Sequence, residues 1–151
     1  MWLTSSDFVD KGKIPRVCTC EGDDLSPALA WGEAPPQTRG YALICNDPDA
    51  PGGVFRHWAA YDIPAAVTGL ARGEGRATQE RFNQTVNDFG RPGYGGPRPP
   101  HGRGAHRYQF RLLALSIDRL PVGKGARCRD VEREAQKHVL AEAELVGTFE
   151  R

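Results

Sequence analysis

The sequence predicts a mainly β domain. Its 151 residues include 18 Gly and 12 Pro, and the apolar segments between these turn residues are short, as in β-rich domains. Three of the segments have strand patterns, whereas only one stretch near the C-terminus has helical spacing. The length suits a single domain over residues 1–151, because one hydrophobic core commonly serves roughly 100 to 200 residues.

Three segments are predicted to form the main strands. Residues 41–45 (YALIC) are a continuous apolar run, which is typical of a buried central strand. Residues 58–63 (WAAYDI) form a second strand that is closed by Pro64. Residues 106–116 (HRYQFRLLALS) alternate apolar and polar side chains at first and then become apolar on both faces, so they are the clearest strand in the chain.

One helix is predicted near the C-terminus, over about residues 130–143 (DVEREAQKHVLAEA). This segment has strong helix formers, acidic residues in its first turn and apolar residues at helical spacing. Residues 144–149 (ELVGTF) follow as a short closing strand, and residues 63–70 (IPAAVTGL) could hold one helical turn. A long loop is predicted between about residues 69 and 107, and loops of that length are uncommon in compact domains unless they are functional.

Charge and composition exclude several classes of function. The formal net charge of +1 argues against a protein that binds nucleic-acid backbones. The sequence has neither a signal-peptide pattern nor an apolar run of about 18 residues, so we expect a cytoplasmic protein without stable membrane insertion. We expect neither a metal nor a cofactor, and the cysteines, which lack CxxC and zinc spacings, are predicted to be free thiols: Cys18, Cys20, Cys45 and Cys128.

Two segments carry side chains with candidate chemistry. Residues 46–64 (NDPDAPGGVFRHWAAYDIP) place Asp47, Asp49 and His57 at a rigid turn and at the start of a strand. Residues 89–107 (FGRPGYGGPRPPHGRGAHR) add glycines, which let a ligand approach the backbone closely, and successive N–H groups that can bind an anion. A histidine could hold a phosphate or carboxylate while an aspartate orients its ring. Together the segments outline an anion pocket.

Each segment also has other interpretations. DPDAP could be only a turn whose aspartates bond their own backbone, His57 could be an ordinary strand-end histidine, and GPRPPHGRG could be a solvated linker or an RNA-contacting segment. Asp47 could orient His57 as the general base of a hydrolase acting on a small ester, although a GxSxG motif is absent. Two histidines and two aspartates could also bind a metal, although no pair has the helical i, i+4 spacing.

In their order and spacing these motifs resemble the phosphatidylethanolamine-binding protein family, which includes Raf kinase inhibitor protein and its bacterial relatives. The motifs that carry the resemblance are DPDAP at 47–51, HW at 57–58 and GYGGPRPPHGRGAHRYQF at 93–110. LSPALAW at 25–31 and HVLAEAELVGTF at 138–149 add to it. The resemblance therefore extends over nearly the whole chain.

The resemblance implies a β-sandwich with a large antiparallel sheet, a smaller sheet and one or two peripheral helices, with a small anion pocket at one end. It implies a non-enzymatic homodimer that binds phosphate, phosphoethanolamine or a similar head group and, as in some members, modulates a kinase or protease. Carried over position by position, it assigns ligand binding to eight residues: Asp47, Asp49, His57, Gly96, Pro97, Pro100, His106 and Tyr108.

Two departures from the family pattern concern the shape of this pocket. The link between DPDAP and the histidine is only GGVFR, so Phe55 is the nearest substitute for an aromatic that a longer loop would supply, and we expect an open pocket. Arg98 directly precedes Pro-Pro. Its guanidinium would strengthen anion binding through charge-assisted hydrogen bonds if it faced the pocket, or it would point outward, and both orientations stay open.

Overall fold

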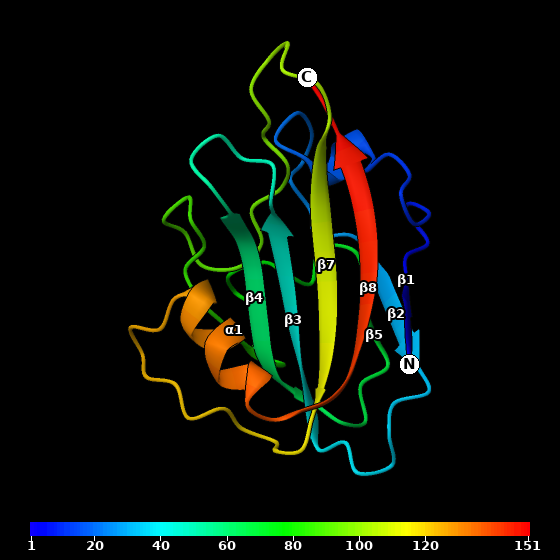
Figure 1. Ribbon diagram of the computed structural model, residues 1–151, viewed down its shortest axis with the longest axis vertical. Coiled ribbons are helices and arrows are strands. Elements are labelled where there is room, and N and C mark those ends of the chain that lie inside the picture. The colour runs from blue at the N-terminus through cyan, green and yellow to red at the C-terminus, as the bar shows by residue number, and fades with distance from the viewer.

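The computed structural model describes all 151 residues and contains two antiparallel sheets and one α-helix (Figure 1). The large sheet has the strand order β6-β4-β3-β7-β8 and the small sheet the order β1-β2-β5. The predicted mainly β sandwich is therefore confirmed. In chain order the elements are β1 (Trp2–Thr4), the 3-10 helix η1 (Arg16–Cys18), β2 (Leu29–Gly32), β3 (Gly40–Asp47), β4 (Phe55–Pro64), β5 (Gly69–Leu70), β6 (Asn83–Gln84), β7 (His106–Leu115), α1 (Cys128–Gln136) and β8 (Val139–Phe149).

Apolar side chains cover both faces of the large sheet. The larger cluster includes Trp58 and Phe110 and packs toward the small sheet, while the smaller cluster includes Ile44 and lies beneath α1. Alternate residues of β3 enter the two clusters, since Leu43 belongs to the first and Ile44 to the second. Burial on both faces explains why YALIC is apolar throughout, and it confirms this segment as a central strand.

The predicted helix was too long at its C-terminal end. Residues 139–143 belong to β8, where Ala141 pairs with Ala114 and Ala143 with Leu112 of β7. Odd-numbered residues of this segment are partly or fully buried and even-numbered ones are exposed, which is the alternation of a strand. The alanines fit a helix as well as a strand, and pairing along β7 decides between the two.

The chain between β4 and β7 is mostly irregular, as predicted, but it contains the short strands β5 and β6. The helical turn predicted within residues 63–70 was wrong, because Pro64 instead begins a tight turn in which its carbonyl accepts a 3.0 Å hydrogen bond from Val67 N–H. β5 follows directly and completes the small sheet.

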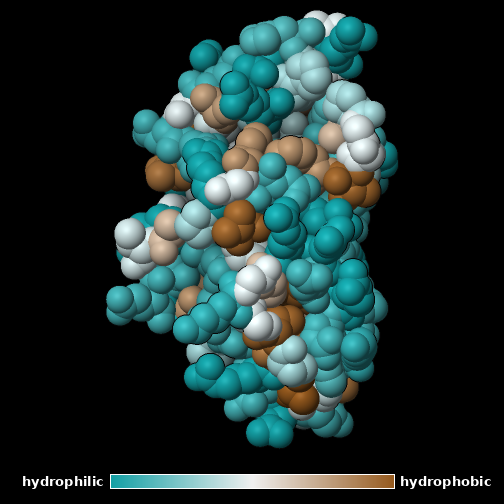
Figure 2. All heavy atoms as spheres, turned by 90° about the vertical axis from the view of Figure 1, so that its left-hand side faces the viewer, coloured by the Kyte–Doolittle hydropathy of each residue, from teal (hydrophilic) through white to brown (hydrophobic).

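The side of the molecule that carries α1 and β4 is largely hydrophilic, and its apolar groups form small separate patches (Figure 2). None of the helices has the length and hydropathy needed to span a membrane. The four cysteines are free thiols, as predicted.

Three strand ends converge at one end of the large sheet, at the top of Figure 1. β3 ends at Asp47, β4 begins at Phe55 and β7 begins at His106. Asp47 pairs directly with Phe55 across the sheet. The two candidate segments, residues 46–64 and 89–107, therefore meet at this end of the sheet. They begin more than 40 residues apart in the chain.

Candidate functional site

A cavity of about 130 Å³ lies at this end of the sheet. It has a mixed lining of imidazole, carboxylate, guanidinium, aromatic and proline groups. Four of the eight predicted ligand residues line it, namely Asp47, His57, Pro100 and His106. The remaining lining residues are Ala50, Pro51, Phe55, Phe89, Arg98 and Pro99.

His106 and Asp47 form a buried pair in the wall of this cavity. His106 Nδ1 lies 2.8 Å from Asp47 Oδ2, and the two side chains are 7% and 5% exposed. Because a carboxylate only accepts hydrogen bonds, Nδ1–H is the donor. Asp47 Oδ1 accepts a 2.8 Å bond from Asp49 N–H. Both oxygens of Asp47 therefore have protein partners, and Nε2 is the ring atom of His106 that stays available to a ligand.

The sequence suggested that Asp47 could orient His57, and the structure gives His57 a different partner. His57 Nδ1 donates a 2.6 Å hydrogen bond to the carbonyl of Gly95, whose N–H donates a 3.0 Å bond back to the His57 carbonyl. Burial lowers the pKa of His57 below 6.5, so its imidazole is neutral at pH 7. With the proton on Nδ1, Nε2 of the neutral ring is a hydrogen-bond acceptor.

The lowered pKa of His57 makes stability depend on pH. The unfolded chain binds a proton as the pH falls below 6.5, whereas the folded ring resists protonation. The stability that neutral His57 contributes is therefore present above pH 6.5 and is lost as the pH falls through the folded pKa. We expect the urea-unfolding free energy to decrease more between about pH 7 and pH 5 in the wild type than in His57→Phe. Equal pH slopes would contradict this account.

Two phenylalanines form an aromatic wall beside His57. The ring of Phe55 lies 4.8 Å from that of His57 and 4.7 Å from that of Phe89, measured between centroids. Phe55 was predicted as a substitute for an aromatic from a longer loop, and it does line the cavity. Phe89 was missed, although it begins the glycine-rich segment. Asn87 places it, because its side-chain oxygen accepts a 2.9 Å bond from Phe89 N–H.

Asp49 and Tyr108 support the cavity without lining it. Asp49 accepts hydrogen bonds from the Arg107 guanidinium at 2.8 and 3.0 Å, and this partner lowers the pKa of Asp49 to about 2. The pair ties the turn after β3 to the start of β7. Tyr108 is fully buried and meets the His57 ring edge-on at 5.3 Å, and burial raises its pKa.

Gly96 and Pro97 also lie outside the cavity lining. Gly96 N–H donates a 2.8 Å hydrogen bond to Asp24 Oδ1, and the Pro97 carbonyl accepts a 3.1 Å bond from Cys20 N–H. A side chain at Gly96 would collide with the Cys18 carbonyl, so glycine is required by this close approach. The segment thus joins the glycine-rich loop to the chain after η1.

Arg98 is exposed and is one of the residues that line the cavity. It has no acidic partner among the ion pairs of the structure: Arg56–Glu132, Arg72–Asp7, Arg81–Glu74, Arg91–Asp24, His106–Asp47, Arg107–Asp49, Arg111–Glu132, Arg111–Glu142, Lys137–Glu134 and His138–Glu134. The guanidinium is therefore available to an anion at the cavity mouth.

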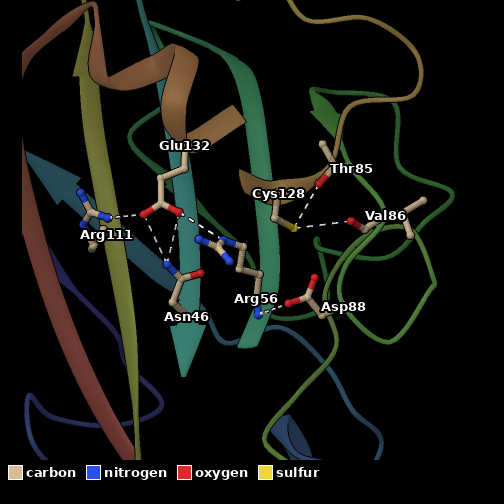
Figure 3. A network of polar contacts seen from close by, with 8 residues as sticks. All are labelled: Asn46, Arg56, Thr85, Val86, Asp88, Arg111, Cys128 and Glu132. Atoms are coloured by element: carbon tan, nitrogen blue, oxygen red, sulfur yellow. Dashed lines mark hydrogen bonds and ion pairs between the residues drawn. The ribbon is translucent and has the colours of Figure 1, made fainter. Parts of the chain in front are cut away.

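A polar network on the opposite face of the large sheet holds the residues just before Asp47 and His57 (Figure 3). Glu132 of α1 accepts bonds from Arg111 at 2.7 Å, from Asn46 at 3.4 Å and from Arg56 at 3.4 Å. Alternation along a strand places neighbouring side chains on opposite faces. Glu132 of the helix thus fixes Asn46 and Arg56. The residues that follow them, Asp47 and His57, line the cavity on the other face of the sheet.

The same network positions the segment that carries Phe89. Arg56 N–H donates a 2.8 Å hydrogen bond to the Asp88 carboxylate (Figure 3). Asp88 N–H donates a 2.9 Å bond back to the Arg56 carbonyl. The Sγ atom of Cys128, at the start of α1, lies 3.2 Å from the Thr85 hydroxyl oxygen.

No group of three or more His, Cys, Asp or Glu side chains has an arrangement suited to a metal.

Comparisons with known proteins agree with the fold and with the motifs. The family model for phosphatidylethanolamine-binding proteins matches residues 4–150. A UPF0098 protein of Aquifex aeolicus is 42% identical and the alignment covers 100% of this chain and 89% of that protein. Escherichia coli YbhB is 37% identical, with 99% of each chain covered.

A solved structure extends the likeness to three dimensions. The crystal structure of Escherichia coli YbcL, described as a member of the mammalian PEBP family, superposes with a TM-score of 0.93 at 32% identity and covers 99% of this chain and 98% of that one. The family resemblance drawn from the motifs is thereby confirmed. Because the family model and these relatives match almost every residue, the chain belongs to the phosphatidylethanolamine-binding protein family.

Proposed function

We propose that the cavity binds a phosphate group or a similar small anionic head group and does not transform it. The observation that carries this proposal is the lining of one small cavity. Two buried histidines line it, each with Nδ1 already bonded to the protein, together with Arg98, which has no acidic partner. Arg98 supplies a charge-assisted donor at the mouth. The volume of about 130 Å³ suits a small head group rather than an extended substrate.

The protonation states favour a particular ionic form of the ligand. Neutral His57 offers an acceptor at Nε2, so a ligand that meets this nitrogen must bring a hydrogen-bond donor. A singly protonated phosphate has a P–OH group for this acceptor and charged oxygens for Arg98. An ammonium group, as in phosphoethanolamine, is a second donor that this nitrogen could accept.

The experiment is calorimetric titration with inorganic phosphate of the wild type, Arg98→Gln and Arg103→Gln. Arg98→Gln is expected to weaken binding about tenfold, the effect of losing one charge-assisted hydrogen bond. Arg103 is exposed in the same loop but does not line the cavity, so its substitution should leave the affinity unchanged. Absence of phosphate binding by the folded wild type would refute the proposal.

A hydrolase is the second candidate function, and the His106–Asp47 pair favours it. An aspartate that orients a histidine is the arrangement of a general base, here with His106 in the place that the sequence suggested for His57. The cavity lining has no serine, threonine or cysteine to serve as a nucleophile, so water would have to attack. A panel of phosphate and carboxylic esters tests this, because equal hydrolysis rates for the wild type and His106→Ala would exclude the hydrolase.

The homodimer and a kinase or protease partner stay predictions.

A further inference from the structure

A second recess, of about 360 Å³, adjoins the cavity on the side of η1. Arg98 and Phe89 line both hollows, so these two residues lie at the boundary between them. Arg91, Arg151 and Asp24 are the charged residues that line only the recess. Of the eight residues that the sequence assigned to ligand binding, only Gly96 lines this recess.

The recess carries an excess of positive charge. Three arginines line it, Arg91, Arg98 and Arg151, and Asp24 is the single acidic side chain among the lining residues. Asp24 is already bonded, because its Oδ2 lies 3.2 Å from the Arg91 guanidinium and its Oδ1 accepts from Gly96 N–H. Neither Arg98 nor Arg151 has an acidic side-chain partner in the structure. Two guanidiniums thus retain donors for an anion.

The backbone around the recess is held in place. Arg151 Nε donates a 2.7 Å hydrogen bond to the Pro99 carbonyl, and Gly102 N–H donates a 3.0 Å bond to a main-chain oxygen of Arg151. These bonds tie the end of the chain after β8 to the loop on both sides of Pro100. The Arg151 guanidinium is therefore anchored at Nε, while its two terminal nitrogens remain for a ligand. Such anchoring reduces the side-chain entropy that a ligand would have to offset.

We propose that the recess binds a second anionic group, so that cavity and recess together take a small molecule with a phosphate at one end and a carboxylate or second phosphate at the other. The inference rests on the proposed function, which places the first phosphate in the cavity. Arg98 borders both hollows and would contact both anionic groups. Arg151 would contact only the second group.

The test compares two matched probes, glycerol 3-phosphate and 3-phosphoglycerate, which differ by a carboxylate in place of a hydroxymethyl group. Calorimetry near physiological salt, where long-range charge effects are screened, is expected to give the wild type an affinity about tenfold higher for 3-phosphoglycerate. Arg151→Gln should lose this preference and retain the affinity for glycerol 3-phosphate. Arg151→Lys, which keeps the charge, should retain part of the preference.

Arg119→Gln is the matched control, because Arg119 is exposed, unpaired and outside both hollows. It makes the same change in net charge and should leave both affinities at their wild-type values. If glycerol 3-phosphate binds and the carboxylate adds nothing, or if Arg119→Gln acts like Arg151→Gln, the second site is refuted while the proposed function stands. If neither probe binds the folded protein, both proposals fail.

Discussion

Replacing Trp58 by alanine is expected to lower the free energy of unfolding by about 3–5 kcal/mol, the usual range for truncation of a large buried aromatic side chain. Trp58 is fully buried in the larger apolar cluster, and its indole N–H donates a 2.7 Å hydrogen bond to Gln84. Its ring meets that of Tyr94 edge-on at 5.5 Å. The substitution would leave a void between the sheets and a side chain of β6 without its partner. Urea unfolding measures the loss.

Trp2→Ala provides the matched control for this substitution. Trp2 is 43% exposed, so the same truncation removes much less buried surface and should cost well under half as much as Trp58→Ala. Trp58→Phe keeps part of the packing and loses the bond to Gln84, so its unfolding free energy should lie between that of the wild type and that of Trp58→Ala. Similar losses for Trp2→Ala and Trp58→Ala would contradict the assignment of the core.

His106→Ala is expected to reduce phosphate affinity by about a hundredfold, in line with the roughly 1–3 kcal/mol lost when a buried group is left without its hydrogen-bond partner. The substitution removes a ring nitrogen from the cavity. It also leaves Asp47, which is 4% exposed, without the partner of its Oδ2 oxygen in the wall that faces the anion. Lost hydrogen bonding and added repulsion act in the same direction. Calorimetry with inorganic phosphate measures the change.

The double variant Asp47→Ala/His106→Ala separates these two effects. Removing the carboxylate as well abolishes the repulsion, so the double variant is expected to bind phosphate better than His106→Ala alone. His101→Ala is the control, because His101 is exposed in the same loop and does not line the cavity. Circular dichroism verifies that each variant is folded. Wild-type affinity in His106→Ala would exclude the buried pair from ligand binding.

The strands and the family were predictable because their signals are local in the sequence. The segment over 106–116 alternates as its half-buried N-terminal part requires, and 41–45 is apolar throughout because both faces are covered. The end of the helix was not predictable in this way. Residues 139–143 suit either structure, and the choice depends on pairing with β7, which lies more than 20 residues earlier in the chain.

The candidate site was predictable in outline and not in its bonding. The motifs located the cavity, but which histidine Asp47 would contact depends on the register between β3 and β7, 59 residues apart. Phe89 was missed because its place in the cavity comes from contacts of the irregular chain with β4. The orientation of Arg98 was left open because a loop side chain has no periodic pattern to fix its direction.

The most direct test of the anion-binding cavity uses the four histidines of the chain. Imidazole nitrogen NMR signals are recorded while inorganic phosphate is added to the folded wild-type protein. His57 and His106 line the cavity, whereas His101 and His138 lie outside it and serve as internal controls. We expect saturable shifts of the His57 and His106 signals with one common dissociation constant. Unchanged His57 and His106 signals at saturating phosphate, or shifts of equal size at all four histidines, would contradict this expectation.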